Sequence, residues 1–357
     1  MRRVMMMAGA LALGAGTATA GGIERSNQSV GILFEQGNYA ELNFGAFSPD
    51  VSGTVAGGLV GSGDMGLGYG TLSLGYKRAL TDKLDMAIIL DQPVGADLNY
   101  NPANAPYPLA GSRASIDSTG ITALLRYKLP NNFSVHGGVR AVRTSGEVAL
   151  FNGAYTMDTS TETDFGYVLG VAWEKPEIAA RVALTYSSAI THAFDANENV
   201  VPVPTAFETE IPQSVNLEFQ TGIAADTLLF GSIRWVDWTA FDISPVGYVG
   251  GFGSPLVEYD NDVITYTLGL GRKFNETWSG AVILGYEKHE GTTTGNLGPH
   301  DGMKSIALAA TYTKDNIKVT GGLRYVDIGD ATTNPPVSGA FSGNSGWGAG
   351  LRVGFSF

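Results

Sequence analysis

Alternation of apolar with small or polar residues, repeated along most of the chain, is the feature that most constrains its fold. In the closing stretch 347–357, every second residue from Trp347 to Phe357 is apolar, and glycines, Arg352 and Ser356 lie between. A period of two with one apolar face is typical of a β-strand. A lipid-facing arginine near the membrane midplane costs about 2–4 kcal/mol, so Arg352 indicates a face that lines a polar interior. The stretch therefore predicts a strand between lipid and a lumen, with an edge strand of a soluble sandwich as the alternative.

The same alternation recurs in about fourteen segments, which short and long connections join in turn. The short turns are expected at Thr81-Asp82, Asn131-Asn132, Lys175-Pro176, Ala225-Asp226, Asn275-Glu276 and Asp315-Asn316. The long connections run to about a dozen residues or more, as loops on the outer side of a barrel do. Lipid offers no partner for an open sheet edge, so such a sheet must close on itself. We predict an all-β fold, a single transmembrane antiparallel β-barrel of about 14 strands over residues 38–357.

The N-terminus predicts export. Two arginines, an apolar run and the small residues Ala18-Thr19-Ala20 are typical of a cleaved signal peptide, placed at residues 1–20. No later stretch has about 18 uninterrupted apolar residues, so no transmembrane helix is expected. Residues 21–37 precede the first strand and have two readings, a reduced hatch that plugs the lumen or a flexible periplasmic leader.

Composition and motifs exclude several classes of function. The net charge of −12 argues against nucleic acid as a partner, because phosphate contacts need clustered lysines and arginines. The chain has no cysteine, so it has no disulfide framework. Motifs for serine hydrolases, nucleotide-binding loops and zinc proteases are absent, and the four histidines are scattered. We therefore expect no enzyme activity, no cofactor and no metal site, although a barrel-type hydrolase is kept as a third hypothesis.

Several segments together resemble the long-chain fatty acid transporter family of outer-membrane proteins, the FadL/TodX-type hydrocarbon transporters. The resemblance covers nearly all of the chain after the signal peptide. It rests on 38–45, on 48–53, on Ile211-Pro-Gln-Ser-Val215, on Trp235-Val-Asp-Trp238 before Phe241, and on 347–357. The family implies a fourteen-strand barrel with an N-terminal hatch, passive uptake of hydrophobic molecules and sideways exit through a gap in the wall.

The resemblance also implies an assembly signal and shows one departure. In outer-membrane barrels the final aromatic strand is read by the barrel assembly machinery, which implies this role for Trp347, Phe355 and Phe357. The family's Asn-Pro-Ala motif precedes the first strand, whereas here only about sixteen residues precede it and Asn101-Pro-Ala103 falls in an expected outer loop. The hatch is therefore expected to be reduced.

The third strand holds the candidate for a lateral opening, at Gln92, Pro93 and Gly95. Proline cannot donate to a strand ladder, and glycine gives the backbone extra freedom. A kink here would open a window between lumen and lipid. The alternative is that Pro93 merely ends the strand at the outer rim.

Residues on lumen parity are the candidates for ligand contact. They are Leu124, Arg126, Arg140, Leu228, Phe230, Arg234 and Trp238. A buried arginine can bind a fatty acid carboxylate through charge-assisted hydrogen bonds. The plainer interpretation is that these and other inward cations pair with Glu41, Asp85, Glu174 and Glu218.

The sequence thus predicts a monomeric outer-membrane barrel of a Gram-negative bacterium. It would carry hydrophobic small molecules, long-chain fatty acids or aromatic hydrocarbons, by passive diffusion, with lateral exit near Pro93. Its partners would be that substrate, outer-membrane lipid and the assembly machinery. The alternative function is a general porin for small hydrophilic solutes.

Overall fold

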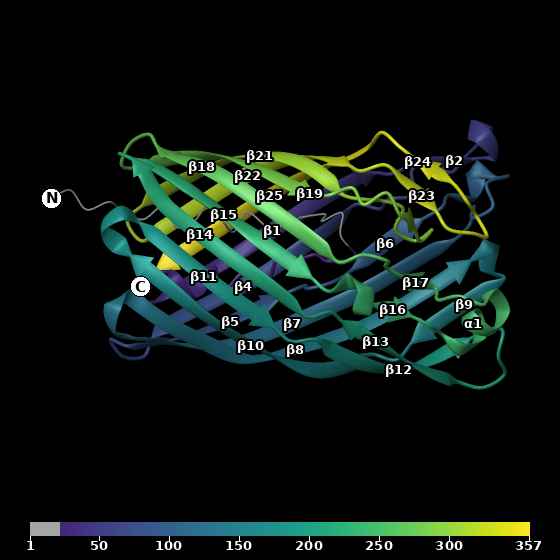
Figure 1. The fold of residues 1–357 in the computed structure, drawn as a ribbon, viewed down its shortest axis with the longest axis horizontal. Coiled ribbons are helices and arrows are strands. Elements are labelled where there is room, and N and C mark those ends of the chain that lie inside the picture. Colours follow the sequence, from purple (N-terminus) through teal and green to yellow (C-terminus); the bar gives the residue numbers. More distant parts are fainter. Residues whose placement is uncertain (1–21) are drawn as a thin grey trace.

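The computed structural model describes residues 22–357, so the predicted signal peptide, residues 1–20, lies outside the described part. Fourteen antiparallel strands form a closed barrel. The ring closes because β1 pairs with β4 on one side and with the last strand, β25, on the other. Figure 1 shows the strands tilted across the long axis of the molecule. The predicted barrel and its strand number are confirmed.

The barrel wall is made of these strands in chain order: β1 (Tyr39–Asp50), β4 (Tyr69–Ala79), β5 (Leu84–Asp91), β7 (Arg113–Lys128), β8 (Phe133–Leu150), β10 (Glu162–Lys175), β11 (Ala180–Ser187), β14 (Ser214–Ala224), β15 (Thr227–Val236), β18 (Val263–Lys273), β19 (Trp278–Glu287), β21 (Met303–Lys314), β22 (Ile317–Ile328) and β25 (Asn344–Ser356). Four further strands extend the wall: β6 (Ala96–Asn99), β9 (Tyr155–Thr159), β12 (Ile190–Glu198) and β13 (Thr205–Ile211).

The connections contain short elements. The loop strands are β2 (Gly53–Val55), β3 (Val60–Gly61), β16 (Asp242–Ile243), β17 (Val257–Glu258), β20 (Thr293–Thr294), β23 (Ala331–Thr333) and β24 (Ala340–Phe341). The helical turns are η1 (Gly31–Phe34), η2 (Ala56–Gly58), η3 (Pro102–Asn104), η4 (Pro130–Asn132), η5 (Phe151–Gly153), η6 (Pro176–Ile178), η7 (Trp238–Ala240) and the α-helix α1 (Val246–Phe252). None of the helices within 22–357 is long and apolar enough to cross a membrane.

The alternation of the sequence becomes the two faces of the wall. In β25, Trp347 and Phe355 are 60% and 41% exposed, whereas Arg352 is 3% exposed and faces inward. The other barrel strands repeat this pattern, so a band of exposed leucine, valine and aromatic side chains surrounds the barrel. An apolar surface of this extent is not a property of soluble monomers, and it fits contact with lipid.

The six short turns lie where the alternation ends, at the end of the barrel that also holds the C-terminus (Figure 1). Residues in left-handed conformation make the reversals tight: Asn131, Ala179, Asp226 and Asp315 have φ between 51° and 61°. Asparagine and aspartate tolerate this region better than most residues. Long loops, with α1, β9 and β24, gather at the opposite end (Figure 1).

Two expected long loops differ from the structure. Residues 141–164 and 187–213 contain extended hairpins: β8 continues to Leu150 and turns through η5 into β9, and β12 turns into β13. The outward side chains of these extensions, such as Asp158 and Asp195, are polar and exposed. The apolar stripe that marks a lipid-facing strand is therefore missing, so the sequence pattern does not predict strands in these two ranges.

Candidate functional site

The segment between residue 22 and the first strand lies inside the barrel. Its apolar side chains Val30, Ile32, Leu33 and Phe34 are buried, none more than 6% exposed. They pack in one cluster with inward residues of the wall, among them Ala87, Leu124, Val168, Ala172 and Ala183. Small residues on the wall leave the space that η1 fills. The chain thus carries its own internal core within the lumen.

Cations of the wall hold this internal segment. The ring of Phe34 lies between two guanidinium groups, with Arg126 Cζ at 4.4 Å and Arg181 Cζ at 4.6 Å from its centroid. Arg126 also donates to the carbonyl of Leu33 at 3.2 Å. Cation–π contacts of this kind stabilise by about 0.5–2 kcal/mol. These two arginines are therefore bound to the segment rather than free in the channel.

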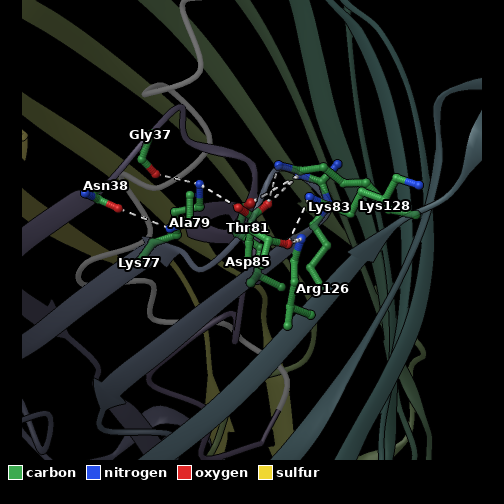
Figure 2. A network of polar contacts seen from close by, with 12 residues as sticks. Gly37, Asn38, Lys77, Ala79, Thr81, Lys83, Asp85, Arg126 and Lys128 are labelled. Carbon is green, nitrogen blue, oxygen red and sulfur yellow. Dashed lines mark hydrogen bonds and ion pairs between the residues drawn. The ribbon is translucent and has the colours of Figure 1, made fainter.

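A polar network contacts the C-terminal end of the same segment, as Figure 2 shows. Asp85, which is 0% exposed, has Lys77 Nζ at 3.2 Å and Lys128 Nζ at 2.9 Å. Lys77 Nζ also donates to the carbonyl of Gly37 at 2.6 Å, and Asn38 Oδ1 accepts from the backbone of Ala79 at 3.1 Å. The network fixes the exit of the segment into β1.

The third barrel strand is interrupted where Pro93 and Gly95 lie. β5 ends at Asp91 and β6 begins at Ala96, and the ladder between β4 and β5 stops at Leu74–Leu90. Between them the chain pairs with the internal segment instead. Arg25 N donates to Pro93 O at 2.9 Å, and Gly95 N donates to Ile23 O at 2.8 Å.

Sequence explains this change of partner. Pro93 has no N–H to offer to β4, and a Cβ at Gly95 would lie 2.6 Å from Arg25 Nε. A side chain provides the link from β4 to this stretch, since Leu72 N donates to Gln92 Oε1 at 3.2 Å. Within residues 22–357, no ladder pair joins 69–73 to 91–95, so the barrel wall has no backbone ladder at this point.

An apolar chamber lies inside the barrel on the side of the long loops. Its floor includes Ile23 and Val94, and its walls come from β6 to β9, β12, β13 and the segment after β15. The apolar lining includes Leu98, Ile116, Val148, Met157, Phe194, Phe207, Phe241, Leu256, Tyr259 and Leu297. The space is about 810 Å³, part of it open to solvent. Burial raises the pKa of the Tyr259 hydroxyl, which keeps this side chain neutral.

Two further cavities lie between the chamber and the interruption of the third strand. One surrounds residues 22–25 and shares Ile23, Leu98 and Tyr259 with the chamber. The other is lined by polar residues of the internal segment and reaches Leu72 and Gln92. Arg25 lines both of them. Each of the three spaces thus shares lining residues with the next, and the last of them borders Gln92 at the interruption of the third strand.

The predicted ligand residues are all buried and inward, but the structure does not bring them to one place. Leu124 and Arg126 contact the internal segment, and Leu228 and Phe230 form a separate cluster with Ala179. Trp238 packs with Phe241 and Tyr259 and covers Gly22. Arg140 differs from these residues because it borders a cavity, a small polar one beside Gln28.

Most inward cations have partners within the protein. Arg126 pairs with Glu174, and Arg352 lies 3.7 Å from Glu41. Arg234 forms a buried pair with Glu24, and Arg140 Nη1 donates to Gln28 Oε1. Both of these partners belong to the internal segment. Sequence analysis missed them because that segment has no strand periodicity.

The chamber residues were also missed. His192, Phe194 and Phe207 lie on hairpins that were expected to be loops, and Tyr259 and Leu297 lie in irregular connections. A signal existed for the first group, because Ile190, His192, Phe194 and Ala196 fall on one parity, opposite Thr191, Ala193 and Asp195. No sequence pattern marks Tyr259 and Leu297, because their side chains point inward only once the barrel has closed.

Comparison with known proteins shows which folds are similar. The sequence matches no protein-family model and no curated protein. A FadL homologue of Pseudomonas aeruginosa has a TM-score of 0.76 at 15% identity, with 92% of each chain covered. The toluene transporter TodX of Pseudomonas putida gives 0.62 at 12% identity, with 90% of each chain covered. The toluene transporter TbuX of Ralstonia pickettii gives 0.61 at 12% identity, covering 91% of this chain and 90% of that one. The chain has the fold of these transport proteins.

Proposed function

We propose that this protein is an outer-membrane channel through which hydrophobic small molecules, long-chain fatty acids or aromatic hydrocarbons, diffuse passively. The observation that carries the proposal is the apolar chamber inside a barrel whose outer surface is itself apolar. A concave, mostly apolar site with few polar groups is typical of small-molecule binding. Similar folds occur in proteins described as toluene transporters and as monoaromatic hydrocarbon channels, which supports the same class of substrate.

The proposed route leaves the lumen sideways near Pro93. The internal segment fills the barrel below the chamber, so a molecule in the chamber meets Ile23 and Val94 first. The cavity around residues 22–25 then leads toward Leu72 and Gln92, where the wall lacks ladder pairs. In this proposal Gln92, Pro93 and Gly95 form the exit, and the substrate enters lipid without crossing the polar network at Asp85.

The remaining sequence predictions complete the proposal. Residues 21–37 act as a reduced hatch, and the signal peptide at 1–20 directs export. Trp347 and Phe355, exposed on the outside of β25, and Phe357, which follows the strand and is also exposed, serve the assembly machinery. Arg140 is the candidate among the inward cations for a carboxylate, because it borders the polar cavity beside Gln28.

Uptake measurements with a double variant test the route. Pro93→Ala with Gly95→Val restores an N–H for the ladder and forces a side chain against Arg25. We expect a several-fold loss of uptake of radiolabelled oleate and toluene by a Gram-negative host that lacks its own channel of this kind. Gly250→Val in α1 is the control, because its new side chain meets open space. Full uptake by the double variant would contradict the exit.

Liposome swelling separates this function from a general porin. A lumen filled by the internal segment should exclude sugars, so proteoliposomes in arabinose should swell no faster than empty ones. Rapid swelling with the intact protein would instead establish the porin. Because the polar cavity next to Arg25 is lined largely by hydrophilic groups, this second candidate is worth the direct measurement.

A further inference from the structure

The barrel wall has a second interruption, between β10 and β12, far from Pro93 in the sequence. The ladder of β10 with β11 ends at Val168–Ser187, and that of β9 with β12 begins at Thr159–Ala196. The register is the same on both sides. Among the described residues, no ladder pair joins 161–166 to 189–194, so the backbone ladder between these two stretches is interrupted over six positions and resumes in the same register. We call this stretch the side opening.

A serine closes the ladder at each end of the side opening. At one end, Ser188 N donates to Tyr167 O at 2.9 Å and Tyr167 N donates to Ser188 Oγ at 2.9 Å. At the other end, Ser160 N donates to Asp195 O at 2.8 Å and Asp195 N donates to Ser160 Oγ at 3.0 Å. The backbone groups at both ends are thus satisfied by local side chains. The opening is a defined feature with its own caps, unlike a frayed strand edge.

Side chains bridge the side opening where the backbone does not. His192 of β12 is 1% exposed, and its Nδ1 lies 2.7 Å from Asp164 Oδ2 of β10. Its Nε2 lies 3.2 Å from Thr144 Oγ1 of β8. Nearer Ser188, the side chain of Ile190 covers Gly166, where a Cβ would lie 2.8 Å from Ile190 Cγ1. His192 and Ile190 therefore span the stretch in which the ladder is interrupted.

The apolar chamber lies directly behind this bridge. His192, Phe194, Thr144 and Thr159 all line the chamber, and they come from both sides of the opening. Ile190 packs with Val94, Val142 and Ile211, next to the chamber floor. On the outer surface, Phe165 and Tyr167 are 73% and 49% exposed, and the exposed residues that precede them on the same face, Thr161 and Thr163, are polar. Aromatic side chains of this kind lie at the membrane–water interface.

That position suits unpaired backbone groups. In the hydrocarbon core each unsatisfied N–H or C=O would cost several kcal/mol, whereas water and lipid headgroups satisfy them at the interface. The structure assigns the side opening as a lateral port that leads into the chamber. We propose that hydrophobic molecules dissolved in the outer leaflet enter the chamber between β10 and β12, past the His192–Asp164 bridge. This rests on the proposed transport function and adds its inlet.

A single cysteine tests the port cleanly, because the natural chain has none. Asp164→Cys, labelled with a bulky maleimide, places an obstacle in the side opening. The control is Thr267→Cys with the same label, on an inward position of β18 where the ladders on both sides are continuous. Uptake of radiolabelled oleate and toluene is measured in cells, and binding of both probes is measured with purified protein in detergent.

We expect the label at position 164 to lower uptake several-fold and to leave probe binding unchanged, whereas the label at position 267 changes neither. His192→Ala, which removes the contacts with Asp164 and Thr144, should raise uptake. Uptake that is unaffected by the label at 164 would overturn the port. Loss of binding together with uptake would also overturn it, because the label would then act in the chamber. If the unmodified protein neither binds nor takes up either probe, the transport function itself falls.

Discussion

At the scale of single residues, the burial of charged side chains is the feature of this molecule with the highest energetic cost. Asp85 and Lys77 have side chains that are 1% and 2% exposed, and Lys128 and Arg126 also approach the same carboxylate. Breaking a buried pair by removing one member costs about 3–5 kcal/mol, because the other charge stays buried without a partner. The single carboxylate of Asp85 therefore stabilises three cations and, through Lys77, the anchor at Gly37.

The first prediction ranks three substitutions in this network. Asp85→Asn should lower the free energy of unfolding by about 3 kcal/mol, because it leaves three cations without this anion. Lys77→Met should have a smaller effect, since Asp85 keeps Lys128. Lys128→Met is the matched control and should cost less than about 1 kcal/mol, because its side chain is 37% exposed and screened. Urea unfolding in lipid vesicles gives the order, and an equal loss for Asp85→Asn and Lys128→Met would contradict it.

At the scale of elements, sequence predicted the strands that touch lipid and missed those that do not. Leu72, Leu169 and Leu308 mark their strands because lipid selects an apolar residue at every second position. The hairpin of β12 and β13 has water outside, so nothing selects an apolar stripe there. The interruption of the third strand was predicted from Pro93, whose chemistry is local. The chamber was not, because Phe207, Tyr259 and Leu297 meet only after the barrel closes.

The internal segment gives the prediction that belongs to this scale. Deletion of residues 23–36 removes the groups that fill the lumen and should make the channel permeable to arabinose in a swelling assay. The control is Phe34→Ala, which keeps the backbone and the ion pair of Glu24 with Arg234. Unchanged exclusion of arabinose by the deletion variant would show that other groups block the lumen. Circular dichroism of both variants establishes that the barrel is still formed.

At the scale of the whole molecule, the structure is a sheet with lipid on one side and protein on the other. The five tryptophans report on this arrangement, since Trp278 and Trp347 are 48% and 60% exposed on the outer surface and Trp238 is 2% exposed inside. A soluble fold would bury its largest apolar side chains together. The outward tryptophans should instead contact acyl chains directly.

Quenching by brominated lipids measures this directly. Variants that keep one tryptophan, with the other four changed to phenylalanine, are reconstituted in vesicles of brominated phosphatidylcholine. Fluorescence of the Trp347 and Trp278 variants should be strongly quenched, and that of the Trp238 variant should not. Equal quenching at all three positions would refute the division of the wall into a lipid face and an inner face.

The pairing of β1 with β25 has a consequence for how the protein is made. The two strands that join to complete the ring lie near opposite ends of the described residues, so the barrel cannot close until β25 has been translated and exported. The residues that immediately precede β1 end up enclosed. During assembly these residues must therefore lie inside the sheet before it closes, or enter the closed barrel from the periplasmic side. The formation of the β1–β25 pairing separates these two orders of events.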